Sequence, residues 1–297
     1  MIDHVRVIFY WFNSISDPLT SLYNEKYSTS FHWFCMCFFL GFVFGVVLYV
    51  LMLYFIVMGW CVMGVGSLVE KLSVKEFASM IDHTLLKPYA DYKLLEKYVE
   101  DTRRYGFAVL MLPPSLLLKA REIAGNTIRL ATVIGFPLGN TFAGAKVLET
   151  RLAAQAGASE VDMVMNINYF KSGDYDRVLD DMKHVVLEAR KNNIGVVKVI
   201  IETGLLSDEE KVKATELVVE SGADYVKTST GFLAGGATIH DVALLYRVAK
   251  GRIKVKAAGG IRHALDALAM IDAGASRIGT STGDKIIEEF IKLKEGK

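Results

Sequence analysis

Cysteine is absent from most of this chain, and its absence excludes several kinds of chemistry. All three Cys lie within the first 67 of the 297 residues, so residues 68–297 can form no disulfide and offer no thiolate nucleophile. A formal net charge of only +1 gives no overall attraction to nucleic acid. No glycine-rich dinucleotide fingerprint follows the first expected strand. We therefore expect no metal, no cofactor and no nucleic-acid partner.

Charged residues are missing from one long stretch. No Asp, Glu, Lys or Arg occurs between residues 27 and 69, and 15 of the 21 residues at 38–58 are Phe, Leu, Ile or Val. As a helix this segment would be about 31 Å long, close to the thickness of a bilayer core. It also exceeds the apolar core of a cleaved signal peptide, which is about 7–15 residues. The sequence thus predicts an N-terminal extension, residues 1–67, with an apolar helix at about 33–63.

The extension has three interpretations. It is a single-span anchor, for which Lys71 and Lys75 favour a cytoplasmic position of the following domain. Alternatively, it is translation upstream of the true start, with Met63 as the initiator. The third interpretation is an uncleaved export signal. The sequence does not separate the first two.

Residues 68–297 have the composition of an ordinary α/β domain, with 62 charged residues among 230. Short β-branched runs alternate there with segments that have apolar residues three and four positions apart, as at 175–192 and 207–221. Ser207 and Glu210 form a capping box, and glycines at 157, 222, 251 and 274 end helices. The expected strands lie at 80–82, 107–112, 128–134, 160–166, 196–202, 224–229, 253–258 and 277–281. Eight such units favour a closed (β/α)8 TIM barrel over an open doubly wound sheet.

Charged residues inside otherwise apolar strands are the candidates for chemistry, because reactive groups of such a barrel project from the carboxyl ends of its strands. Each alone could be a solvated strand end or half of a structural ion pair. Several lysines on neighbouring strands, however, suit a Schiff-base site in which one amine attacks a carbonyl and a second lowers its pKa. A second ammonium about 6 Å away supplies about two pKa units. Spacing alone does not say which lysine reacts. The candidates are Asp82, Asp162, Lys198, Glu202, Lys227, Lys254 and Lys256.

Glycine and hydroxyl residues follow the late strands. Bare backbone amides at glycine turns and hydroxyls at a helix N-terminus can hold an anion, and barrels often bind a phosphate there. Each loop alone could be a tight turn or an N-cap, but the loops together favour a phosphorylated ligand. The residues are Gly231, Gly259, Gly260, Gly279, Ser281 and Thr282.

Six motifs in one order resemble the signatures of deoxyribose-phosphate aldolases. They cover nearly all of the region from about residue 72 to the C-terminus. The motifs are 82–88 (DHTLLKP), 135–139 (GFPLG), 160–164 (EVDMV), 198–203 (KVIIET), 227–231 (KTSTG) and 256–262 (KAAGGIR).

The resemblance implies reversible cleavage of 2-deoxy-D-ribose 5-phosphate to D-glyceraldehyde 3-phosphate and acetaldehyde by a class I, Schiff-base aldolase without a cofactor. Matched to the family motifs, Lys227 forms the Schiff base and Lys256 lowers its pKa and relays protons. Asp162 shuttles protons, Asp82 supports it, and Lys198 lines the site. The resemblance also implies phosphate contacts from the six residues named above, a homo-oligomer and a cytoplasmic location, which fits an export signal least.

Two features depart from the family. The second strand reads VLMLPP at 109–114 where many members carry a cysteine, which should alter the lining around the substrate's hydroxyl end. The extension is the other, and it would add a membrane contact only if it is a real anchor. Two other functions stay open: a class I aldolase for a longer ketose phosphate, and a catalytically dead, membrane-tethered barrel that binds sugar phosphates.

Overall fold

The computed structural model describes residues 65–233 and 235–296. The expected apolar helix at about 33–63 lies outside these residues, so its existence stays a prediction, as does the domain boundary at residue 67. The barrel belongs to a unit that spans Val62–Lys297. None of the helices in the described ranges is both long enough and apolar enough to cross a bilayer.

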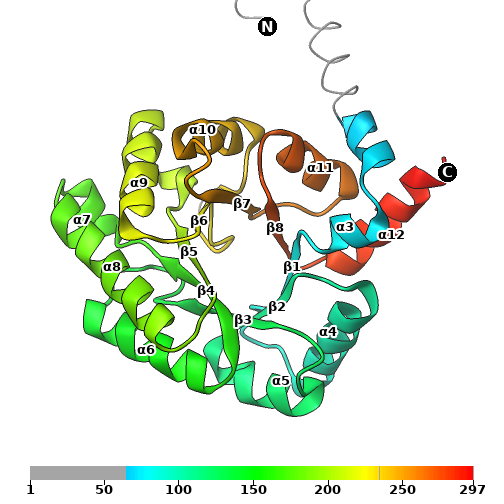
Figure 1. The fold of residues 1–297 in the computed structure, drawn as a ribbon, viewed down its shortest axis with the longest axis horizontal. Coiled ribbons are helices and arrows are strands. Elements are labelled where there is room, and N and C mark those ends of the chain that lie inside the picture. Colours follow the sequence, from blue (N-terminus) through cyan, green and yellow to red (C-terminus); the bar gives the residue numbers. More distant parts are fainter. Residues whose placement is uncertain (1–64, 234, 297) are drawn as a thin grey trace, which may run out of the picture. The chain divides into compact units, whose positions relative to one another are not determined.

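Eight parallel strands close into a barrel in sequence order, with β1 paired to both β2 and β8 (Figure 1). The TIM barrel predicted from the alternating pattern is confirmed. The strands are β1 (Ile81–Thr84), β2 (Val109–Leu112), β3 (Leu130–Ile134), β4 (Ala158–Val164), β5 (Val196–Ile200), β6 (Tyr225–Lys227), β7 (Lys254–Ala258) and β8 (Arg277–Thr280).

Helices follow the strands and surround the barrel in Figure 1. Residues 65–71 are helical as well. The remaining helices are α3 (Val74–Ala78), α4 (Tyr92–Tyr105), η1 (Pro114–Leu116), α5 (Leu117–Ala124), α6 (Ala143–Gln155), α7 (Ile167–Lys171), α8 (Tyr175–Lys191), η2 (Thr203–Leu205), α9 (Asp208–Ser221), α10 (Ile239–Ala249), α11 (Ala264–Asp272) and α12 (Gly283–Lys294).

The local signals for helix ends are confirmed. Ser207 caps α9 by accepting a hydrogen bond from the Glu210 amide, and the Glu210 side chain accepts one from the Ser207 amide. Gly222 ends the same helix with φ +80°, a left-handed conformation that glycine adopts without steric cost. These contacts are local in sequence, which is why the residue pattern could predict them.

Some strand ends differ from the predicted ones because side-chain contacts end the ladder. The sixth strand was expected at 224–229, but β6 stops at Lys227. Immediately after it, the Thr228 hydroxyl donates to the Ala258 carbonyl, at 2.9 Å, and accepts from the Ala258 amide. The Thr228 hydroxyl thus replaces a backbone carbonyl as the acceptor for the Ala258 amide. β4 begins two residues earlier than expected, at Ala158.

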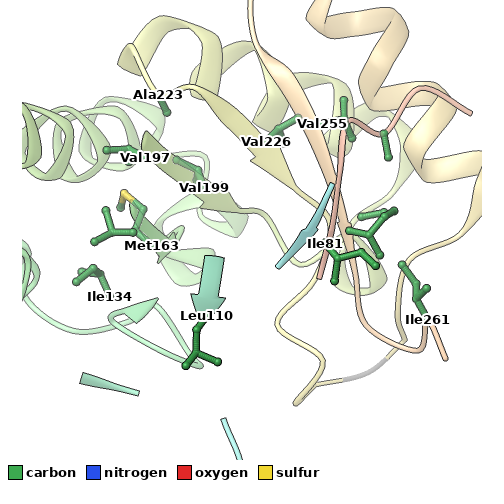
Figure 2. Close-up of a cluster of buried hydrophobic side chains, with 14 of the residues drawn as sticks. Ile81, Leu110, Ile134, Met163, Val197, Val199, Ala223, Val226, Val255 and Ile261 are labelled. Carbon is green, nitrogen blue, oxygen red and sulfur yellow. The ribbon is translucent and has the colours of Figure 1, made fainter. Parts of the chain in front are cut away.

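The main hydrophobic core lies between the strands and the helices. Outward-facing strand residues such as Ile81, Leu110, Met163, Val199 and Val226 are fully buried there (Figure 2). Since side chains alternate along a strand, the residues between them face the barrel interior. The outward faces of the strands supply the apolar core, and the faces toward the barrel interior can carry charged residues.

Inside the barrel, β2 and β3 contribute an apolar wall. Val109, Met111, Ala131 and Val133 pack together, with Leu86 and Phe136 against them. This is where the second strand departs from the family motif. The interior positions of the other strands carry the charged residues, and the register joins Asp162 to Lys198 and Lys227 to Lys256.

Candidate active site

Asp162 lies at the centre of a buried ionic cluster. Its Oδ2 accepts hydrogen bonds from Lys227 Nζ at 2.8 Å and Lys256 Nζ at 2.7 Å, and its Oδ1 accepts from Lys198 Nζ at 2.9 Å. Burial alone would raise the pKa of Asp162, but the three ammonium groups outweigh it and hold the pKa well below its usual range. Asp162 is therefore a carboxylate that contacts all three lysines.

Asp82 is the second acid of this cluster. Lys256 Nζ bonds to its Oδ2, and Arg277 Nη1 bonds to its Oδ1 at 2.7 Å. Burial opposes ionisation, yet Lys256, Lys198 and Arg277 lower the pKa of Asp82 to about 2. Lys256 therefore bridges the two acids, as expected of a residue that passes protons between groups in the site.

Lys198 is fully buried, and three carboxylates stabilise its protonated form. Its Nζ lies 2.6 Å from Glu160 Oε2 and 3.7 Å from Asp82 Oδ2, in addition to its bond to Asp162. Burial lowers the pKa of Lys198, but the three acids outweigh burial and raise the pKa above its usual value. A permanently charged ammonium is no nucleophile.

Lys227 differs from Lys198 although both contact Asp162. Burial lowers the pKa of Lys227, Asp162 opposes that shift, and the charges of Lys256 and Lys198 add to it, so that the pKa falls to about 8. Roughly one molecule in ten then carries a neutral amine at pH 7. Lys256 does contribute in the expected direction, but burial is the larger cause of the shift.

The connected ion pairs balance when Lys227 is neutral. They join four basic side chains, Lys198, Lys227, Lys256 and Arg277, to three acids, Asp82, Glu160 and Asp162. A neutral Lys227 leaves three positive and three negative charges in a volume shielded from water. This balance would hold with any one lysine neutral, and the lowered pKa of Lys227 points to this one.

Three residues of this region were not assigned a role from the sequence. Arg277 and Glu160 complete the ionic network from the interior faces of β8 and β4, with Arg277 Nη2 3.4 Å from Glu160 Oε1. Glu202 is buried with a left-handed backbone, φ +55°, and accepts a hydrogen bond from the Thr230 amide at 2.9 Å. Their charge inside apolar strands was the available signal. Lys254, a candidate of the same kind, is exposed and stacks over Tyr225 instead.

The predicted phosphate residues of the two loops after β6 and β7 lie against each other. A Cβ added at Gly231 would lie 3.7 Å from Gly259 Cα, and Gly259 has φ +96°. Gly260, also left-handed, has open space around its Cα. Gly231 and Gly260 are exposed in these two closely spaced glycine turns.

The third phosphate element is the start of α12. Gly279 lies in β8 beside Ala258, and Ser281 and Thr282 lead into the helix, which begins at Gly283. Thr282 is half-buried and its hydroxyl bonds to the Arg262 carbonyl at 3.4 Å, which joins this turn to the loop after β7. The carboxyl ends of β6, β7 and β8 therefore gather all six predicted phosphate residues at one edge.

One group of residues that could bind a metal ion occurs within residues 65–233 and 235–296. Asp208, His240 and Asp241 lie close together on the surface. The Lys211 ammonium, however, lies 3.0 Å from Asp208 and 2.7 Å from Asp241. These carboxylates are thus already paired with a cation from the protein.

Comparison with known proteins gives one consistent result. A family described as DeoC/LacD family aldolase matches residues 77–289. A curated deoxyribose-phosphate aldolase of Caldanaerobacter subterraneus subsp. tengcongensis is 50% identical over 221 residues, which cover 74% of this chain and 96% of that protein. A second one, of Thermococcus gammatolerans, is 50% identical over 216 residues, covering 72% of this chain and 96% of that protein.

Solved structures agree with these sequence relatives. An aldolase named QR15 has a TM-score of 0.70 and 43% identity, and the match covers 74% of this chain and 97% of that one. A tetrameric deoxyribose phosphate aldolase from Aeropyrum pernix has a TM-score of 0.72 and 34% identity, and the match covers 78% and 98% of the two chains.

Proposed function

The chain belongs to the DeoC/LacD family of aldolases, and we propose that Lys227 is the residue through which its barrel acts. The reaction is the reversible aldol cleavage of 2-deoxy-D-ribose 5-phosphate into D-glyceraldehyde 3-phosphate and acetaldehyde. Curated relatives at about half identity carry the name of this activity. A longer ketose phosphate and a dead barrel are therefore not favoured.

One observation carries the assignment of Lys227. Three lysines contact Asp162, but the environment lowers the pKa of Lys227 to about 8 and raises that of Lys198. The neutral amine of Lys227 attacks C1 of the open-chain sugar, and loss of water gives an iminium ion. This cation withdraws electrons from the bond between C2 and C3.

Asp162 and Lys256 transfer protons in the following steps. Asp162, hydrogen-bonded to the Lys256 ammonium, accepts the proton of the C3 hydroxyl as the C2–C3 bond breaks, and Lys256 relays protons between Asp162 and Asp82. Glyceraldehyde 3-phosphate leaves, and an enamine remains on Lys227. Protonation at C2 and addition of water then release acetaldehyde and restore the amine. Lys198 keeps Asp162 oriented through its ion pair, and Asp82 in turn contacts Lys198.

Trapping of the imine tests this proposal. Borohydride added with acetaldehyde should attach a two-carbon group to the peptide that contains Lys227, as read by mass spectrometry. Lys227→Met should abolish the adduct, whereas Lys254→Met, a change at an exposed lysine, should leave it. An adduct on Lys198 or Lys254 would show that the assignment is wrong.

We also propose that the phosphate of the substrate binds between the loops after β6 and β7 and the start of α12. The support is the convergence of Gly231, Gly259, Gly260 and Ser281 at one edge of the barrel, together with the open space at Gly260. Backbone amides at such turns and at a helix start bind anions well. A phosphate there would hold the sugar with its other end toward Lys227.

A homo-oligomer is the assembly we propose, with the outer face of α6 as its contact. This helix turns Lys146 and Thr150 inward, where both are fully buried, but leaves Leu148 and Leu152 51% and 53% exposed. The two leucines border a cavity of about 940 Å³ beside α5. Apolar surface of this kind is typical of contacts between identical subunits, and the relative from Aeropyrum pernix is a tetramer.

Light scattering of the native protein tests this contact. Leu148→Glu combined with Leu152→Glu should lower the native mass toward that of one chain. Leu187→Glu is the matched control, because Leu187 is 67% exposed on α8 and lies outside the proposed contact. An unchanged mass in the double variant would refute the placement.

A further inference from the structure

Helix α4 contacts the turn that leads into α12, and it does so from behind the proposed phosphate site. The two helices are neighbours around the barrel (Figure 1). The Tyr98 hydroxyl donates a hydrogen bond to the Ser281 carbonyl at 2.8 Å. Tyr98 is only 6% exposed, so water cannot replace this donor easily. The phenol thus fixes the peptide between Ser281 and Thr282.

The surroundings of Tyr98 hold its ring in one place. The ring stacks on His83 with centroids 4.3 Å apart and 14° between the planes, and His83 in turn lies 4.9 Å from Phe107. Burial raises the pKa of the Tyr98 phenol, so it keeps the proton that it donates. A stacked, protonated phenol has little freedom to move away from its acceptor.

The start of α12 lies in close contact with the same group of rings. A Cβ added at Gly283 would lie 2.8 Å from His83 Nδ1 and 3.2 Å from Phe107, so the helix can begin there only with glycine. Lys97, next to Tyr98, bonds to Asp284 in the first turn of α12 at 2.9 Å. The helix start is therefore held at Ser281 and Asp284 by side chains of α4.

We propose that Tyr98 is a positioning residue for phosphate binding: it orients the turn at 281–283 and does not touch the substrate itself. The inference rests on the proposed phosphate site. Fixing the Ser281 carbonyl fixes the whole peptide group, including the Thr282 amide, which donates to Thr280 Oγ1 at 3.1 Å. Both contacts hold the turn in one conformation, and an anion site at a helix start depends on the direction of the polar groups in that turn. Loss of the phenol should therefore weaken the binding of phosphate without altering the lysine chemistry.

Tyr98→Phe isolates the hydroxyl, because the ring that stacks on His83 remains. The KM for 2-deoxy-D-ribose 5-phosphate and the inhibition constant of inorganic phosphate should both rise about three- to tenfold, the range that one hydrogen bond provides. The kcat should stay within about twofold, as should kcat/KM for unphosphorylated deoxyribose. A general structural defect would lower activity on both sugars alike.

Tyr105→Phe is the matched control. Tyr105 also lies on α4 and donates to a residue of α12, but its acceptor is Glu288, farther along the helix, at 3.0 Å. This variant should change neither KM nor inhibition by phosphate. An equal effect of both variants would show that they act only through the packing of α4 on α12, which would overturn the proposal.

Two failures can be told apart. If inorganic phosphate inhibits the wild type, and Ser281→Asp abolishes that inhibition while Tyr98→Phe leaves it unchanged, the phosphate site stands and the role of Tyr98 is refuted. If phosphate does not compete with the substrate in the wild type, the proposed phosphate site is wrong, and the inference about Tyr98 is refuted with it.

Discussion

Burial and ion pairing act in opposite directions on the lysines of this barrel, and the balance differs from one lysine to the next. Lys198 contacts three carboxylates and keeps its proton, whereas Lys227 has a close contact only with Asp162. Burial lowers the pKa of both, but only in Lys227 do the acids fail to compensate. The number of acidic neighbours therefore supports the proposal that Lys227 is the nucleophile.

At the residue scale, the first prediction separates the roles of Lys256 and Asp162. Lys256→Leu removes a positive charge near Lys227, so the pKa of Lys227 should rise by up to about two units. The ascending limb of the pH–rate profile, which reports deprotonation of Lys227, should shift to higher pH, and raising the pH should recover part of the activity. Asp162→Asn lacks a proton carrier, so alkali should not rescue it.

Profiles from about pH 6 to pH 10 measure this difference, with imine trapping to show that the sugar still binds. Because burial is the main cause of the lowered pKa of Lys227, Lys256→Leu should retain part of the shift. The absence of any alkaline shift in Lys256→Leu would refute the role of its charge.

A second residue-scale prediction concerns stability. Lys227 has a folded-state pKa of about 8, below the unfolded value of about 10.4. Between these values the unfolded chain binds more protons, so the stability of the wild type rises with pH in that window. Lys227→Met should therefore be more stable than the wild type at pH 7, by at most about 3 kcal/mol.

Urea unfolding at several pH values measures this gain. The difference between Lys227→Met and the wild type should be largest below about pH 8 and should shrink as the pH rises toward about 10.4, above which the lysine is neutral in both states. Lys254→Met, at an exposed position, should show no such pH dependence. A pH-independent difference would mean that the lowered pKa of Lys227 has no part in stability.

At the element scale, the proposed phosphate site combines the loops after β6 and β7 with the start of α12. Ser281→Asp places a carboxylate in the turn before α12, where it should repel a bound phosphate. The KM for the phosphorylated sugar should rise steeply, while activity on unphosphorylated deoxyribose falls much less. Steady-state kinetics on both sugars measure this, and equal losses on both would contradict the placement of the phosphate.

The ends of the helices and strands show where the local sequence pattern was sufficient for a correct prediction. The capping box at Ser207 and the glycine after α9 were predicted correctly, because both motifs act within a few residues of the chain. The end of β6 was not, because the contact between Thr228 and Ala258 joins residues that are 30 positions apart. The inverted faces of α6, with Lys146 inside and leucines outside, also depend on distant neighbours. Lys146 bonds to Asp181 of α8.

At the scale of the whole molecule, every contact described above for the candidate active site joins residues within 65–233 and 235–296. A chain that begins at Met63 should therefore have the same kcat/KM as the full chain. Sedimentation of the full chain with membranes after carbonate extraction would identify the extension as an anchor. Loss of activity in the shorter chain would show that the first 62 residues contribute to the barrel.

The sequence by itself determined the class of fold, the aldolase family and the lysines and acids of the site. Hydrophobic period, helix caps and motifs are local properties, and eight alternating units have few ways to close. Charged residues within apolar strands likewise stand out without any structure.

Only the tertiary structure decided which lysine can be neutral and what orients the phosphate turn. The pKa of a buried amine depends on burial and on charges that approach it from other strands, and Asp162 meets its lysines across 36, 65 and 94 positions of sequence. Arg277 and Glu160 enter the same balance from β8 and β4. Tyr98 reaches Ser281 across 183 positions. Such contacts form only when the barrel closes, so a local pattern of residues cannot predict them.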